Sequence, residues 1–185
     1  MWSSHPHRTP RRVAVHHDLR RVRQQPLNHP RRVALGIAAT VVVVDQLTKW
    51  WALEALRDAP IQVIGEFFEL SLTRNSGAAF NLLQGAGSIL ALLAVIVVVV
   101  IVFAVGSARD RLSTFALGLV LGGAVGNLLD RLFRGEGLAD GEVVDFLDFS
   151  FWPTFNVADA AITVGALLAL LEAVRSPSKS SSPIT

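Results

Sequence analysis

Cysteine is absent from this chain of 185 residues, and histidine occurs only near its beginning. The lack of cysteine excludes disulfides, thiol nucleophiles and metal sites with thiolate ligands. Every histidine precedes the first apolar run, which excludes a histidine metal site or a Ser-His-Asp triad inside a membrane. The metalloprotease pattern HExxH is also missing. Most hydrolase chemistries are thereby removed, and we expect neither a metal nor a cofactor.

Charge is also scarce, since only 17% of the residues are charged and 51% are hydrophobic. Soluble domains usually carry about 25% charged residues. No charged residue occurs from Leu82 to Ala108, and roughly 20 apolar residues suffice to cross a bilayer as a helix. A buried helix of a soluble protein explains such a run less well. We predict an all-α membrane protein with four transmembrane helices, over about 33–56, 87–106, 112–129 and 155–171.

The one basic segment is at the start, where residues 1–32 contain eight arginines and a single acid, Asp18. This arm lacks apolar periodicity and is predicted to be disordered. It could bind nucleic acid or lipid headgroups, or it could hold the N-terminus in the cytoplasm. We favour the last reading and expect no nucleic-acid partner, because the arm directly precedes a span. The predicted division is an arm (1–32), a four-span domain (33–174) and a disordered tail (175–185).

The remaining basic residues suggest an orientation. Arg109 and Arg111 follow the second span, and Arg175 and Lys179 follow the fourth. The positive-inside rule places these ends in the cytoplasm together with both termini. Segments 57–86 and 132–155 then lie outside. Near-alternation over 61–80 predicts short strands, a small extracytoplasmic β element at the outer surface.

Ionisable residues in membrane spans are costly and indicate function by default. Asp45 and Lys49 are four residues apart, so they share a helix face and can pair. The pair could be a structural clamp or could contact substrate. Asn75 precedes Gly77 at the entrance to the second span, where a tight turn or a binding role would explain it.

The third span ends in a further polar group. Asn127 and Arg131 share a face, with Asp130 beside them, and Arg131 could hold a lipid phosphate or a substrate carbonyl. A structural Asp130–Arg131 network is the alternative. Glycines at intervals of four in this span predict a close helix-packing face: Gly118, Gly122 and Gly126.

Two aspartates near the last span carry the main catalytic hypothesis. Asp159 shares a helix face with Asn156, and Asp145 lies in a β-branched and aromatic stretch shortly before. If the chain folds back, the two carboxylates share a proton, so one activates water and the other donates a proton. Helix capping by the two aspartates is the simpler alternative.

At these motifs the sequence resembles the lipoprotein signal peptidase (signal peptidase II) family. DQLTK, NSGAAF, GGAVGNLLDR and VVDF…FNVAD occur in that family's order, over about Val33 to Leu171. The resemblance implies a membrane-embedded aspartic endopeptidase of the bacterial cytoplasmic membrane, with its site near the outer face. We expect the protein to be a monomer. It would cleave diacylglyceryl-modified prolipoproteins before the lipidated cysteine, in contact with membrane lipid.

The resemblance also implies roles for individual residues. The family's catalytic aspartates fall on Asp145 and Asp159. Substrate-binding or site-bracing positions fall on Asp45, Lys49, Asn75, Gly77, Asn127, Asp130, Arg131 and Asn156. The stretch 132–142 is longer than in the family, and the interval between the two catalytic aspartates is shorter.

Two rival functions follow from the same residues. Ser76 and Lys49 could form a Ser/Lys hydrolase, because a desolvated lysine can act as a base. The acids could instead relay protons or ions across the membrane. The first rival leaves Asp145 and Asp159 unexplained, and the second predicts acids at many depths rather than at one level.

Overall fold

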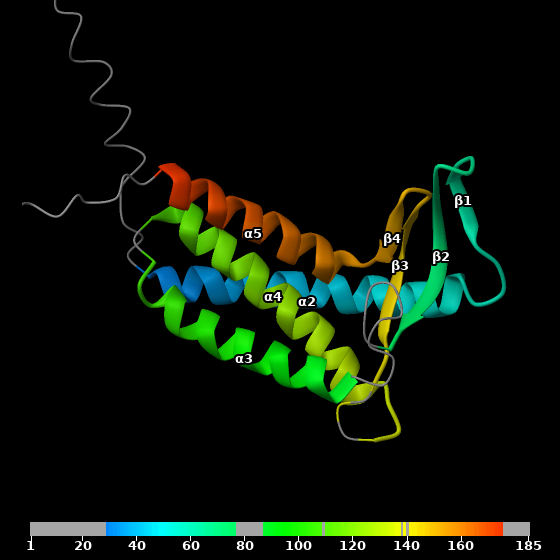
Figure 1. Ribbon diagram of the computed structural model, residues 1–185, viewed down its shortest axis with the longest axis horizontal. Helices are drawn as coiled ribbons and strands as arrows, with labels where there is room; N and C mark the ends of the chain where they lie inside the picture. The colour runs from blue at the N-terminus through cyan, green and yellow to red at the C-terminus, as the bar shows by residue number, and fades with distance from the viewer. Residues whose placement is uncertain (1–28, 77–86, 109, 138, 140, 176–185) are drawn as a thin grey trace, which may run out of the picture.

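The computed structural model describes residues 29–76, 87–108, 110–137, 139 and 141–175. Its four long helices are α2 (Pro30–Ala55), α3 (Gly87–Val105), α4 (Arg111–Phe133) and α5 (Val157–Arg175). Each is long and apolar enough to cross a membrane, which confirms the predicted four spans. α4 contacts the other three helices, and α3 packs mainly on α4 (Figure 1).

Local sequence explains where the helices begin. α2 begins at Pro30 rather than at the predicted Val33, because proline is pre-organised for the first helical position. The predicted boundary between arm and domain therefore falls inside α2. α4 follows Asp110, whose carboxylate accepts a hydrogen bond from the Ser113 amide at 2.8 Å. The rest of the predicted arm (1–28) and of the tail (176–185) lies outside the described residues.

The glycine face of α4 lets two helices approach closely. A Cβ at Gly122 would lie 2.7 Å from Cβ of Val41 and 2.8 Å from the backbone oxygen of Ala38, both on α2. Gly118 and Gly126 face α2 in the same way. The predicted packing face is confirmed, and it brings the polar residues of α2 and α4 together.

A four-stranded antiparallel sheet covers one end of the bundle (Figure 1). Its strands are β1 (Ile61–Ile64), β2 (Phe68–Asn75), β3 (Val143–Phe149) and β4 (Trp152–Phe155), in that order. Strands in 61–80 were predicted, whereas β3 and β4 were not. Because β4 occupies 152–155, α5 begins at Val157 and not at the predicted Phe155. The pairing of β2 with β3 aligns Thr73 with Asp145.

The sheet is amphipathic. Gln62, Glu69 and Asp148 lie side by side on adjacent strands and, by strand alternation, point to one face. On either side of these residues, a row of paired apolar residues crosses the strands and points to the opposite face. One row is Ile61, Leu70, Leu147 and Phe155, and the other is Ile64, Phe68, Phe149 and Trp152. Part of this apolar face packs on the C-terminal turns of α2, at Ala52 and Leu56.

Candidate active site

One asparagine contacts both predicted catalytic aspartates. Asn156 Nδ2 donates to Asp145 Oδ1 at 2.6 Å. The Asn156 backbone amide donates to Asp159 Oδ2 at 3.3 Å, and Asn156 Oδ1 accepts from the Asp159 amide at 2.9 Å. The fold therefore brings Asp145, on β3, and Asp159, on α5, to the same fully buried side chain.

The reciprocal bonds of Asn156 and Asp159 have the geometry of a capping box at the start of α5. The capping alternative is thus right about the position of Asp159. Negative charge on a carboxylate in the first helical turn is stabilised by the helix dipole. Asp145 caps no helix, because it lies within β3. Capping therefore accounts for one of the two aspartates only.

Asp145 occupies a site that disfavours its charged form. Its side chain is almost fully buried, and this burial, together with the negative charge of Asp159, raises the pKa of Asp145 to about 6. Hydrogen bonds from Asn75 (3.1 Å) and Asn156 oppose the rise. The two carboxylates therefore differ in their surroundings, as an acid and base pair requires.

Asp159 is connected to a buried ionic cluster through Asn127. Asn127 Nδ2 donates to Asp159 Oδ1 at 2.7 Å, and Asn127 Oδ1 accepts from Lys49 Nζ at 3.0 Å. Lys49 also forms ion pairs with Asp45 (2.9 Å) and with Asp130 (2.8 Å), and all three side chains are fully buried. The three hydrogens of the ammonium thus have three partners.

The alternative reading, a structural network of Asp130 with Arg131, does not describe the ion pairs of Asp130, although the two charges interact. Asp130 pairs with Lys49 and with Arg134, whose Nε is 2.8 Å from Asp130 Oδ1. Arg131 instead donates from Nη1 to the backbone oxygen of Asn127 at 3.3 Å. Successive helical residues point about 100° apart, so Arg131 faces the aspartate pair while Arg134, one turn after Asp130, shares its face.

Sequence reasoning missed three contributions to this cluster. Gln46 Nε2 donates to Asp130 Oδ1 (3.0 Å) and to Asp45 Oδ2 (3.2 Å). Asp45 Oδ1 accepts from the backbone amide of Ala158 at 2.9 Å, so α2 holds the N-terminus of α5. Arg134 is the third. Gln46 stood inside the DQLTK motif, but no spacing rule connected it to Asp130. The i,i+4 spacing of Asp130 and Arg134 was a signal that could have indicated their ion pair.

The remaining predicted positions bear on the rival hydrolase. Asn75 contacts Asp145, as described, while Gly77 lies outside the described residues. Lys49 is engaged by two carboxylates and an amide, so its ammonium is not available as the base of a Ser76/Lys49 pair. The geometry favours the aspartate pair over that hydrolase.

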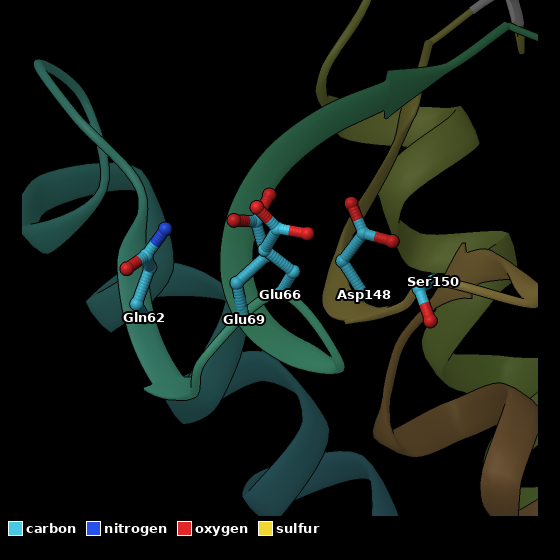
Figure 2. Close-up of a pocket in the computed structure, with 5 residues that line it drawn as sticks. All are labelled: Gln62, Glu66, Glu69, Asp148 and Ser150. Carbon is cyan, nitrogen blue, oxygen red and sulfur yellow. The ribbon is translucent and has the colours of Figure 1, made fainter.

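A separate hollow lies on the polar face of the sheet (Figure 2). Glu66, Glu69, Asp148, Gln62 and Ser150 line it. Neither member of the aspartate pair belongs to this lining. Among the residues that the structure describes, no group of three or more histidine, cysteine, aspartate or glutamate side chains is placed to hold a metal ion.

Four membrane-spanning helices, with a strand carboxylate and a helix carboxylate that meet at one shared asparagine, are the arrangement expected of an aspartic-type peptidase of the membrane. Residues 37–175 match the family described as Signal peptidase (SPase) II. The chain belongs to this family of aspartic peptidases, and it is a multi-pass protein of the bacterial inner membrane.

Individual relatives agree with the family match. The lipoprotein signal peptidase of Rhodococcus jostii (strain RHA1) is 44% identical over 146 residues, which cover 78% of this chain and 74% of that protein. The lipoprotein signal peptidase of Mycobacterium tuberculosis (strain H37Rv) is 40% identical, with 76% and 70% covered. A bacterial membrane enzyme solved by the in meso method matches with TM-score 0.70 and 28% identity, covering 82% of this chain and 93% of that one.

Proposed function

We propose that this chain removes signal peptides from diacylglyceryl-modified prolipoproteins by cutting before the lipidated cysteine, with Asp145 and Asp159 as the catalytic pair. The observation that carries the assignment is the position of Asn156, which contacts both carboxylates. The names of the relatives indicate lipoprotein signal peptides as the substrate.

The two environments suggest how the roles divide. Asp159, at the positive end of the α5 dipole, is the general base that takes a proton from water as the water attacks the scissile carbonyl. Asp145, with its raised pKa, holds the proton that passes to the leaving amide nitrogen. The tetrahedral intermediate then collapses to a carboxylic acid and an amine. The pair begins and ends with one proton between its members.

The other predicted positions support this pair. Asn75, Asn127 and Asn156 donate hydrogen bonds to the carboxylates and fix their orientation. Arg131 lies close enough for its charge to interact with Asp145 and Asp159, so it stabilises the negative charge that develops during attack. The ion pairs of Lys49 with Asp45 and Asp130 hold α2, α4 and α5 together next to the site. Gly77 is proposed to contact the substrate, because it matches a position of the family motif.

Both termini are proposed to be cytoplasmic, with the site near the outer face. Arg31, Arg32, Arg111 and Arg175 lie at the helix ends opposite the sheet, which the positive-inside rule assigns to the cytoplasm (Figure 1). The two proposed catalytic carboxylates meet without a residue of a second chain, and we propose that the protein acts as a monomer.

The apolar face of the sheet is proposed to contact lipid. It continues the apolar surface of α2, where Trp50 and Trp51 are exposed, and it ends in Phe151 and Trp152, which are 69% and 62% exposed. Aromatic side chains of this kind gather at the membrane–water interface. The carboxylates on the opposite face would then point to water.

The central test replaces each aspartate by asparagine in the intact protein. Asp145→Asn and Asp159→Asn should each lower turnover of a diacylated precursor peptide by at least about 10²-fold, since each removes a general acid or base. The double variant should be scarcely worse than either single one, because the pair acts as a unit.

Asp148→Asn is the matched control. Asp148 lies three residues from Asp145 on the same strand, but its carboxylate accepts from the Ser71 hydroxyl (2.8 Å) on the polar face of the sheet. Its turnover should stay near that of the parent. Substantial turnover in either catalytic variant, or a loss in Asp148→Asn as large as theirs, would mean that the pair has been assigned to the wrong residues.

A further inference from the structure

Two side-chain amides of the polar cluster are each held between a cation and a carboxylate. Lys49 is only a donor, so the oxygen of Asn127 must face it and the NH₂ group must face Asp159. The cation therefore makes Asn127 a donor to the catalytic carboxylate. Asn156 Nδ2 also donates to Asn127 Oδ1, at 3.2 Å, so Lys49 and Asn156 together hold the NH₂ group of Asn127 toward Asp159.

Gln46 repeats the arrangement one step further from the site. Arg134 Nη2 donates to Gln46 Oε1 at 3.4 Å, and Gln46 Nε2 then donates to Asp130 Oδ1 and Asp45 Oδ2. Arg134 Nε also donates to Asp130 Oδ1 at 2.8 Å. Arg134 thus orients the Gln46 amide and shares Asp130 with Lys49.

The charges explain why this matters for catalysis. Asp45 and Asp130 are fully buried and oppose a single buried ammonium, that of Lys49. Arg134, whose side chain is 26% exposed, supplies the second positive charge. If Arg134 were absent, Lys49 would be the sole described ion-pair partner of Asp130, and Asp130 would draw the ammonium toward itself, away from Asn127.

We propose that Arg134 is a positioning residue for Asp159, acting through Asp130, Lys49 and Asn127. Arg134 is the C-cap residue of α4, so the end of this helix supplies a charge to the site. The inference rests on the proposed role of Asp159.

The test compares Arg134→Gln with Arg57→Gln in the full-length protein, using a diacylated precursor peptide. Arg57 is a matched control, because its ion pair with Glu54 is exposed at 66% and 59%. Arg134→Gln should lower kcat roughly 10- to 100-fold, as expected for misplaced catalytic geometry, with KM changed less than about twofold. Arg57→Gln should change neither constant.

A double-variant cycle separates positioning from folding. If Arg134 acts through Asn127, Arg134→Gln should have no further effect on kcat in an Asn127→Ala background. An unchanged kcat in the single variant, or an equal loss in both backgrounds, would overturn the proposal.

An activity-independent measurement distinguishes failure of this inference from failure of the proposed function. In protein labelled with [¹⁵N]asparagine, the side-chain NH₂ signals of Asn127, identified by their loss in Asn127→Ala, should move in Arg134→Gln and stay in place in Arg57→Gln. Unmoved signals in Arg134→Gln would overturn the inference. A parent protein that cleaves no lipidated precursor would refute the proposed function alone.

Discussion

At the scale of single residues, the site depends on groups that can only donate. Lys49 and Arg134 cannot accept hydrogen bonds, so each fixes the direction of the amide beside it. Asparagine amides then supply donors to both carboxylates of the proposed catalytic pair. Every buried side-chain nitrogen and oxygen within the described residues has a partner. The orientation of the aspartate pair therefore follows from a connected set of charges.

The sequence predicted those contacts that depend on spacing within one element. Asp45 and Lys49 are four residues apart on α2 and do pair. The sequence could not predict the Lys49–Asp130 pair, because it depends on how α2 is rotated against α4. One of the two readings joined Asp130 to its neighbour Arg131, and the pair of Asp130 with Arg134 was missed although its i,i+4 spacing follows the same rule.

The raised pKa of Asp145 predicts a pH-dependent contribution to stability. A carboxyl group whose pKa rises from 3.8 to about 6 on folding stabilises the protein below pH 3.8, and that contribution is lost as the pH rises through 6. The free energy of unfolding falls by about 3 kcal/mol over this range. Melting temperatures of the parent and of Asp145→Asn, compared from pH 4 to pH 7.5, should therefore shift in favour of the variant as the pH increases.

Asparagine does not titrate, so any hydrogen bond that Asp145→Asn loses adds a constant offset that cancels in this comparison. Asp148→Asn provides a second reference on the same strand. A difference between parent and Asp145→Asn that stays constant over this pH range would contradict the buried, proton-holding environment of Asp145.

At the scale of elements, α4 positions the site because its glycines let α2 and α5 come close. The predicted glycine face was correct, since small residues at intervals of four leave few other packing arrangements. β3 and β4 were missed because their residues form short apolar runs, which periodicity cannot assign to strand or helix. Pairing with β2 gives them their strand conformation, and that pairing is non-local.

Gly126 gives the sharpest test of this packing. A Cβ at Gly126 would lie 2.7 Å from Asp45 Oδ2, so Gly126→Ala should displace the carboxylate that pairs with Lys49. We expect a loss of about 1–3 kcal/mol in unfolding free energy, typical of overpacking, together with lower turnover. Thermal unfolding in detergent measures the first effect.

Gly36 on α2 is the control, because a Cβ there meets nothing within 4 Å. Gly36→Ala should leave turnover unchanged and raise stability by up to about 1 kcal/mol, since alanine favours the helix. Equal effects of the two substitutions would show that the close contact with Asp45 has no energetic weight.

The amphipathic sheet makes a second prediction at this scale. With Trp2, Trp50 and Trp51 replaced by phenylalanine, the fluorescence of Trp152 should be quenched by brominated lipids in nanodiscs. Its exposed ring belongs to the apolar face that we assign to the lipid. A tryptophan at Gln62, on the polar face, with Trp152 also replaced by phenylalanine, should escape quenching. Equal quenching at both positions would argue against a sheet that lies on the membrane by one face.

At the scale of the whole molecule, the ends of α2 and α5 that adjoin the two termini lie at the end of the bundle opposite the sheet (Figure 1). An even number of spans requires both ends of the chain to lie on the same side of the membrane. The positions of the basic residues led to the same prediction from the sequence. The absolute orientation is open to direct measurement, because a chain without cysteine gives no background to thiol labelling.

Single cysteines at Ser107 and Ser150 should react with a membrane-impermeant maleimide from opposite sides. Both serines are exposed, one after α3 and the other between β3 and β4. In intact bacterial cells Ser150→Cys should be labelled, and Ser107→Cys should react only after the membrane is opened. Labelling of both from outside would refute the proposed orientation.

The bond from the Ala158 amide to Asp45 has a consequence for how the protein is made. Asp45 precedes Ala158, whose amide it accepts from, by 113 positions in the chain. Lys49 likewise is synthesised well before its partners Asn127 and Asp130. Until α5 inserts, the pair on α2 neutralises itself through its i,i+4 contact. Insertion of the last helix completes the cluster and delivers Asp159 in the same event. With Asp159 as a member of the proposed catalytic pair, a chain interrupted before α5 is expected to be inert as a protease, so the order of synthesis would keep unfinished copies from cutting other proteins.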